Sequence, residues 1–160
     1  MPDQKKQKGF TLVEIIAVLA VMGIVVVFVA SRMASTDDVK NKAMAEALKS
    51  HIRYVQMRAM NTDPVAASCY ASFGINMSAN SYYMFRNCDF NDKVILPGSE
   101  TDVVSLENLT LSPANTVAFD RYGRPCSNKH CSSGSLYTAN QTITLGTETI
   151  TITKETGFVP

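Results

Sequence analysis

A long apolar run near the N-terminus constrains this chain more than any other feature. Between Ile15 and Ala30 there is no charged or strongly polar side chain. A membrane-spanning helix needs about 20 mostly apolar residues, and the run reaches that length when it begins at Phe10 and includes Glu14. We therefore predict one membrane-spanning helix over residues 10–30.

The residues that flank the run set its orientation and leave three interpretations open. Three lysines within residues 1–9 precede it, so the positive-inside rule places the N-terminus in the cytoplasm and Ser31 onward outside. A cleaved signal peptide with a small-residue site at Val29-Ala30-Ser31 is one interpretation, but the run exceeds the usual apolar core of about 7–15 residues. A plain signal anchor is the second, and it leaves Glu14 unexplained.

Glu14 needs an explanation, because a carboxylate in an apolar segment costs a few kcal/mol unless it is paired or lies near the interface. The third interpretation supplies one. The stretch Gly9-Phe10-Thr11-Leu12-Val13-Glu14, after a basic leader and before a spanning helix, resembles the prepilin motif of type IV pilins and type II secretion pseudopilins. The resemblance implies that a prepilin peptidase cuts between Gly9 and Phe10 and methylates the new amine of Phe10. Glu14 then becomes the fifth mature residue and matches the acidic position of the family.

The same resemblance implies how such a subunit assembles. In a filament core, Glu14 of one subunit meets the α-amine of Phe10 in a neighbour, and each charge removes the desolvation cost of the other. The implied partners are other pilin or pseudopilin subunits, the prepilin peptidase and an inner-membrane assembly platform. The implied location is the inner membrane, with one span and a periplasmic C-terminal domain, and then a pilus or pseudopilus filament.

The helix is predicted to continue beyond the membrane as far as Asn61. No proline or glycine occurs between Ser31 and Asn61, and Pro64 ends the pattern. Apolar residues recur in this stretch at helical spacing and predict one buried face: Val39, Ala43, Leu48, Ile52, Val55 and Ala59. We interpret His51 as a surface or interface residue rather than a ligand or base.

Short β-rich runs separated by turn residues follow Pro64. The predicted strands are 65–73, 81–86, 93–96, 116–120, 135–137, 141–145 and 148–153, with loops at 89–92, 97–102 and 127–134. Gly146 and Thr147 join the last two strands, and glycine in the first position predicts a type II′ turn. The chain is thus predicted to divide into a leader (1–9), a membrane or filament-core helix (10–30), an amphipathic half-helix (31–63) and a β-rich domain (64–160). This is an α+β pilin fold, in which a long N-terminal helix packs against an antiparallel sheet.

Four cysteines lie in the predicted β-rich domain and suit an oxidising compartment. Three pairings are possible, and we favour Cys69–Cys88 with Cys126–Cys131, because both bonds close short loops. The alternative is a metal site that uses Cys126, Cys131 and His130, but it lacks a C-x-x-C pair and a fourth ligand.

The C-terminal third carries a second, less specific resemblance. The stretch Phe119-Asp120-Arg121-Tyr122-Gly123-Arg124-Pro125 and the tail at 152–159 are similar to the GspH/FimT group of minor pilins and pseudopilins, a broad group that includes minor pilins of mannose-sensitive haemagglutinin-type pili. This resemblance implies a minor pilin or pseudopilin subunit.

Some FimT-like proteins capture DNA through a basic Gly-Arg-x-Arg stretch, which suggests an alternative function. Here the stretch reads Gly123-Arg124-Pro125-Cys126, so the second arginine is missing. Arg121, Arg124 and Lys129 therefore belong either to a solvated loop against a neighbouring subunit or to a contact with DNA phosphates.

No pattern in the chain indicates catalysis. It has two histidines and no P-loop, G-x-S-x-G or H-E-x-x-H motif. The net charge is +1 before leader cleavage and −1 for the mature chain, which does not favour a nucleic-acid partner. A calcium loop at 89–92 lacks the length and spacing of a defined site. We predict no enzymatic activity, no catalytic residue, no metal and no cofactor.

Overall fold

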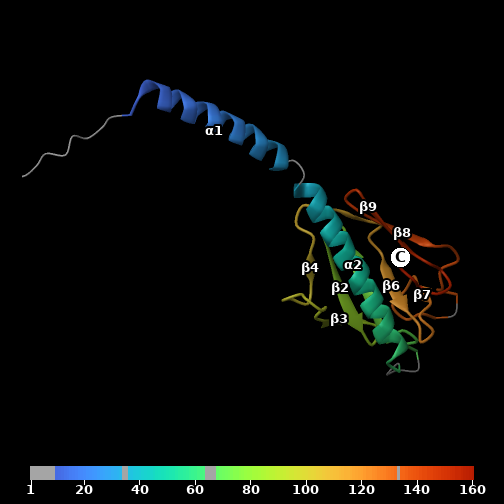
Figure 1. Ribbon diagram of the computed structural model, residues 1–160. Helices are drawn as coiled ribbons and strands as arrows, with labels where there is room; N and C mark the ends of the chain where they lie inside the picture. The colour runs from blue at the N-terminus through green and yellow to red at the C-terminus, as the bar shows by residue number, and fades with distance from the viewer. Residues whose placement is uncertain (1–9, 34–35, 64–67, 133) are drawn as a thin grey trace, which may run out of the picture. The chain divides into compact units, whose positions relative to one another are not determined.

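The computed structural model of the chain describes residues 10–33, 36–63, 68–132 and 134–160. The chain falls into two compact units, Met1–Val39 and Lys40–Pro160 (Figure 1). An apolar helix makes up most of the first unit, and the second unit combines a helix with antiparallel sheets. The predicted α+β class is confirmed.

Helix α1, Leu12–Met33, begins at a defined cap. Thr11 precedes it, and its Oγ1 accepts a hydrogen bond from the amide of Glu14 at 3.3 Å, as an N-cap threonine does. The segment Leu12–Ala30 has a mean hydropathy of 3.0 and exposes its apolar side chains. In length and composition, α1 is therefore a helix that can cross a membrane.

Helix α2, Thr36–Met60, ends immediately before the predicted stop at residues 61–64. Its predicted continuity with α1 lies outside the described residues, as does Pro64. The buried residues of α2 are spaced by three and four positions: Ala45, Leu48, Ile52, Val55 and Ala59. The prediction was wrong for Val39 and Ala43, which are exposed. Ala43 is out of register with this spacing, and Val39 precedes the part of α2 that is buried.

The described part of the second unit contains nine strands in two antiparallel sheets. The larger sheet has the order β3-β2-β1-β6-β7, and β4 also pairs with β2. Its strands are β1 (Phe73–Ser78), β2 (Ser81–Arg86), β3 (Asp89–Val94), β4 (Val104–Ser105), β6 (Thr116–Phe119) and β7 (Pro125–Cys126). The smaller sheet has the order β5-β8-β9 and consists of β5 (Leu111–Ser112), β8 (Gln141–Leu145) and β9 (Glu148–Ile152). Gly146 joins β8 to β9 with a φ of 58°, the sign that the predicted turn requires.

Several strands differ from their predicted bounds. Strands β2 and β8 match, whereas β6 and β9 each end one residue early. The strand predicted at 65–73 is wrong where it is described, because β1 begins only at Phe73. The loop predicted at 89–92 belongs to β3, and the strand predicted at 135–137 is reduced to one bridge between Leu136 and Cys126. The two-residue strands β4, β5 and β7 are too short for an alternating pattern to reveal them.

Gly74 is the reason that β1 escapes prediction from its apolar pattern. Phe73, Ile75 and Met77 are buried, but Gly74 and Asn76 alternate with them and lower the apparent strand propensity. A Cβ on Gly74 would overlap the ring of Phe85. The glycine therefore leaves space for an aromatic side chain of the neighbouring strand.

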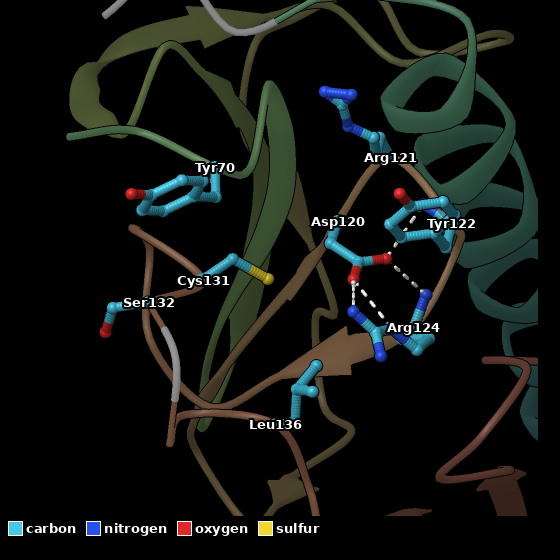
Figure 2. Close-up of a pocket in the computed structure, with 8 residues that line it drawn as sticks. All are labelled: Tyr70, Asp120, Arg121, Tyr122, Arg124, Cys131, Ser132 and Leu136. Carbon is cyan, nitrogen blue, oxygen red and sulfur yellow. Dashed lines mark hydrogen bonds and ion pairs between the residues drawn. The ribbon is translucent and has the colours of Figure 1, made fainter. Parts of the chain in front are cut away.

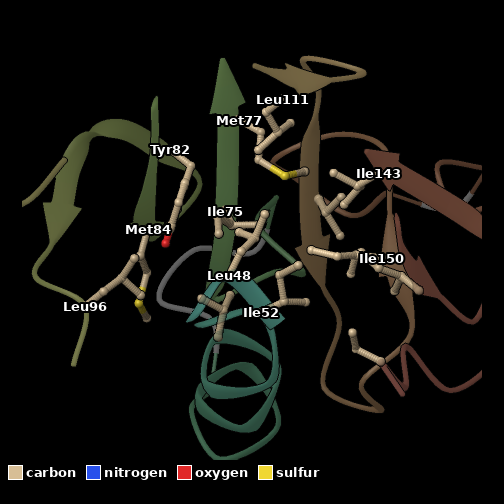
Figure 3. Packing of buried hydrophobic residues seen from close by; sticks show 14 of the residues in the cluster. Leu48, Ile52, Ile75, Met77, Tyr82, Met84, Leu96, Leu111, Ile143 and Ile150 are labelled. Atoms are coloured by element: carbon tan, nitrogen blue, oxygen red, sulfur yellow. The ribbon is translucent and has the colours of Figure 1, made fainter. Parts of the chain in front are cut away.

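One face of the larger sheet packs against α2. Leu48 and Ile52 of α2 approach Ile75 of β1, and Ile143 and Ile150 of the smaller sheet belong to the same apolar cluster (Figure 3). The buried face of α2 thus shares one apolar core with side chains from both sheets.

The opposite face of the larger sheet carries a smaller cluster, because side chains alternate along each strand. Phe85 and Phe90 meet edge to face with ring centroids 5.0 Å apart, and Ala118, Cys126 and Cys131 are buried in the same cluster. The segment that contains these two cysteines therefore covers the face that α2 leaves free.

The segment after β9 returns to α2. Arg53 Nε donates a hydrogen bond to the carbonyl of Val159 at 3.0 Å, and Gln56 Nε2 donates to the carbonyl of Thr156. The side chain of Val159 is fully buried in the main core. Residues 100 or more positions apart in the chain thus complete one core.

His51 is buried, so its interpretation as a surface residue was wrong. Its side chain is 8% exposed, and both ring nitrogens have partners. Nε2 lies 3.0 Å from the carbonyl oxygen of Pro97, and Nδ1 lies 2.8 Å from the hydroxyl of Tyr82. Because a carbonyl only accepts, Nε2 carries a proton in this pair, and in that tautomer Tyr82 donates to Nδ1. Burial raises the pKa of the Tyr82 hydroxyl to about 12.

Tyr82→Phe tests this buried pair. We expect the free energy of unfolding to fall by about 1–2 kcal/mol at neutral pH, because His51 Nδ1 loses its donor. The wild type should also lose about 2–3 kcal/mol between pH 10 and pH 12, since Tyr82 ionises near 10 when unfolded and near 12 when folded. In urea unfolding of the full chain in detergent, the variant should lack the part of this alkaline loss that Tyr82 contributes. The exposed control Tyr122→Phe should retain it, and identical pH profiles for both variants would contradict the assignment.

Candidate functional site

The N-terminal residues of functional interest lie at the start of α1. Gly9, the predicted cleavage position, is outside the described residues. Phe10 is 81% exposed, and Glu14 lies exposed in the first turn of α1. Among the described residues, no hydrogen bond or ion pair reaches the Glu14 carboxylate. A carboxylate in an apolar segment needs a partner. Because no described residue supplies one, the Glu14 carboxylate is available to pair with a cation.

A second group of residues gathers around the turn that follows β6. The carboxylate of Asp120 accepts hydrogen bonds from the amides of Tyr122 and Arg124, both at 2.9 Å. It also pairs with the Arg124 guanidinium, with Nε at 2.8 Å and Nη2 at 2.7 Å. Asp120 is nearly buried, so it holds the turn and Arg124 in one fixed arrangement.

The same turn is attached to α2. Gly123 has a φ of 78°, a conformation that favours glycine, and its carbonyl accepts a hydrogen bond from Gln56 Nε2 at 2.9 Å. A Cβ on Gly123 would lie 2.9 Å from Sδ of Met60. The backbone conformation therefore favours glycine here, and any larger residue would also displace the end of the Met60 side chain.

Two disulfides hold the segments beside this turn. The structure joins Cys69 to Cys88 and Cys126 to Cys131, with Cα–Cα distances of 5.9 Å and 5.3 Å, which is the pairing favoured from the sequence. The sulfurs of Cys126 and Cys131 are bonded to each other, so the alternative of a thiolate metal site at this loop is wrong. The amide of Tyr70 donates to the carbonyl of His130 at 2.9 Å and connects the two segments.

These elements enclose a cavity of about 380 Å³ (Figure 2). Its walls combine aromatic, cationic and polar side chains: Tyr70, Asp120, Arg121, Tyr122, Arg124, Cys131, Ser132 and Leu136. The rings of Tyr70 and Tyr122 lie on opposite sides of Asp120 in this view.

The structure brings together two of the three predicted DNA-contact residues. Arg121 and Arg124 line the cavity, whereas Lys129 does not, because its Nζ lies 4.9 Å from the ring centroid of Phe90. Sequence reasoning did not single out Asp120 or Tyr70. The spacing Asp120-Arg121-Tyr122-Gly123 is typical of a turn in which aspartate caps the following amides, and it could have identified Asp120. No local signal could have identified Tyr70.

Comparison with known families adds one finding. Residues 4–30 match the prokaryotic N-terminal methylation motif. The chain carries the signature of type IV pilins and pseudopilins. Comparisons with curated proteins and with solved structures return no match.

The pilin signature covers the leader from residue 4, Phe10, Glu14 and the apolar part of α1, but it does not extend to the second unit. It implies processing by a prepilin peptidase and assembly with other pilins. The apolar helix fits a single-pass membrane anchor.

Asp120→Ala tests whether this carboxylate organises the turn. We expect the free energy of unfolding to fall by about 2 kcal/mol or more, because two amides and a partly exposed arginine lose their shared acceptor. Asp92→Ala is the matched control, since its ion pair with Arg86 lies on the surface and should contribute about 1 kcal/mol or less. Urea unfolding of both full-length variants measures the difference. Equal losses would contradict the organising role of Asp120.

Proposed function

We propose that this chain is a minor pilin or pseudopilin subunit of a type IV pilus or a type II secretion pseudopilus. In this proposal, prepilin peptidase cuts after Gly9, the amine of Phe10 is methylated, and α1 enters the core of a filament. The observation that supports it most is the methylation motif at residues 4–30, which includes an apolar helix whose one carboxylate, that of Glu14, has no partner among the described residues.

Glu14 gives the proposed assembly its chemistry. Cleavage creates a cationic amine at Phe10, four residues from Glu14. In a bundle of apolar helices, each of these charges is costly when alone, and their pairing between subunits offsets the desolvation of both. Only one axial position of an entering subunit brings the two charges together, so the pair sets its register.

The surrounding steps follow from the same proposal. Before assembly, the processed subunit is held in the inner membrane by α1, with the second unit in the periplasm. An assembly platform in that membrane then moves it into the filament. The chain has no nucleotide-binding motif, so the energy for extraction comes from a partner protein.

A DNA-binding minor pilin is the second candidate, and one observation favours it: Arg121 and Arg124 line the same cavity. Two other observations favour a subunit with a purely structural role. Asp120 already pairs with Arg124. Residues 64–160 also contain eight Asp or Glu against six Lys or Arg, a net charge of −2, whereas phosphate-backbone binding depends on clustered cations.

The first test concerns the mature N-terminus. Intact mass and N-terminal sequencing of the native protein should show a chain that begins with N-methylated Phe10. Gly9→Leu should block cleavage and leave the leader attached, because the substitution alters the cleavage position. A mature chain that begins at Arg32 would instead identify an ordinary signal peptide and overturn the proposal.

The second test concerns Glu14. Glu14→Ala should reduce the yield of filaments at least about tenfold, since an unpaired buried charge costs about 3–5 kcal/mol. Membrane insertion, followed by fractionation, should be unchanged because the apolar run is intact. Glu46→Ala is the control, since this carboxylate lies exposed on α2 and, among the described residues, pairs with Lys49 alone. Normal filament assembly by Glu14→Ala would contradict the proposed pairing.

A further inference from the structure

The cavity beside the Asp120 turn is not used by the assembly chemistry of Phe10 and Glu14. We propose that it binds an acidic saccharide: the carboxylate of a uronic acid pairs with Arg121, and the sugar ring packs against the tyrosine walls. The volume of about 380 Å³ lies at the lower end of the range for small-ligand pockets, about 300–1,000 Å³. This binding function goes beyond the assembly role and does not depend on it.

Arg121 supplies the charge that the ligand must match. Its only recorded contact among the described residues is the ring of Tyr122, 5.9 Å from the guanidinium carbon. Arg124 differs, because Asp120 already binds its guanidinium (Figure 2). The cavity thus offers one uncompensated guanidinium, whose planar fork of donors fits a single carboxylate.

The tyrosines supply surface for an uncharged ring. Tyr70 is 56% exposed and Tyr122 is 69% exposed, although both line a cavity and large aromatic side chains are usually more buried. Such side chains combine an apolar face with a hydroxyl and lose little conformational entropy on binding. A sugar presents C–H groups to such a face and hydroxyls to polar neighbours such as Ser132.

The walls are held in place before any ligand arrives. The amide of Tyr70 is bonded to the carbonyl of His130, and the preceding residue, Cys69, is in a disulfide. The amide of Tyr122 is bonded to the carboxylate of Asp120. Because immobilisation of loops is a main cost of binding, a cavity built on two disulfides and a buried carboxylate retains more of its interaction energy.

The charge balance favours a singly charged sugar unit over a nucleic acid. A polyphosphate needs several cations along a track, but Lys129 lies against Phe90 and Asp120 offsets Arg124. One free arginine beside aromatic walls matches one carboxylate on a ring.

The test is isothermal titration calorimetry of the processed full-length chain in detergent. The probes are a short oligogalacturonate, the same oligosaccharide with its carboxylates methyl-esterified, and duplex DNA. We expect the oligogalacturonate to bind at low salt and weaken as salt is added. The methyl ester should bind to the wild type at least about tenfold more weakly than the oligogalacturonate does. The oligogalacturonate should likewise bind to Arg121→Gln at least about tenfold more weakly than to the wild type, because each change removes a charge-assisted hydrogen bond. Tyr122→Ala should weaken binding several-fold.

Matched variants separate the site from general charge and surface effects. Lys42→Gln removes one exposed positive charge, and Phe158→Ala removes one exposed aromatic ring, and neither residue lines the cavity. Both should bind as the wild type does. Thermal melts of Arg121→Gln should match the wild type, since this side chain makes no hydrogen bond or ion pair with the described residues.

Four results would each overturn the proposal. They are no binding of oligogalacturonate at low salt, equal binding of its methyl ester, unchanged affinity of Arg121→Gln, and binding of DNA alone through the same residues. The last result would assign the cavity to nucleic acid. The mature N-terminus and filament yield are measured separately, so failure of the pilin proposal would be distinguishable from failure of this one.

Discussion

The packing of α2 against both sheets is the interaction on which the second unit depends. Leu48, Ile52, Val55 and Ala59 are almost fully buried, and their neighbours come from β1 as well as from β8 and β9. Core residues of both sheets belong to the same cluster as the buried face of α2, so neither sheet covers the helix alone. Stability therefore comes from one shared core, whose apolar burial contributes about 25 cal/mol for each Å².

That arrangement also positions the cavity. Gln56, one residue beyond the buried Val55, donates a hydrogen bond to the carbonyl of Gly123, and Asp120 fixes the side chain of Arg124, which lies four residues farther along the chain. The binding walls are thus connected to the helix through hydrogen bonds rather than through loops alone. Two disulfides restrain the other side of the cavity, and Cys126 and Cys131 also belong to the smaller apolar cluster.

Local signals in the sequence predicted much of the fold and less of the cavity. The apolar run, the helical spacing of α2, the β8–β9 hairpin and the cysteine pairing all arise from neighbouring residues, and the structure contains each of them. The start of β1 was predicted wrongly because Gly74 interrupts the apolar pattern. The glycine leaves space for the ring of Phe85, a requirement that the local sequence does not reveal. His51 was misjudged because its two acceptor and donor partners, Tyr82 and Pro97, lie far along the chain. Tyr70 joins the cavity through a backbone bond to His130, which only the folded chain creates.

The burial of Val159 beside α2 has a consequence for the order in which this domain is made. The helix is synthesised first, yet its apolar face stays uncovered until β8, β9 and the segment that reaches Val159 have followed it. Contacts of such long sequence separation form slowly, because the loop between them must close before they stabilise anything. During that interval, the nascent chain exposes the apolar face of α2, which follows the apolar helix α1 in the chain. A chaperone that shields α2, or the membrane surface itself, would therefore protect the chain from aggregation until synthesis reaches the residues that cover it.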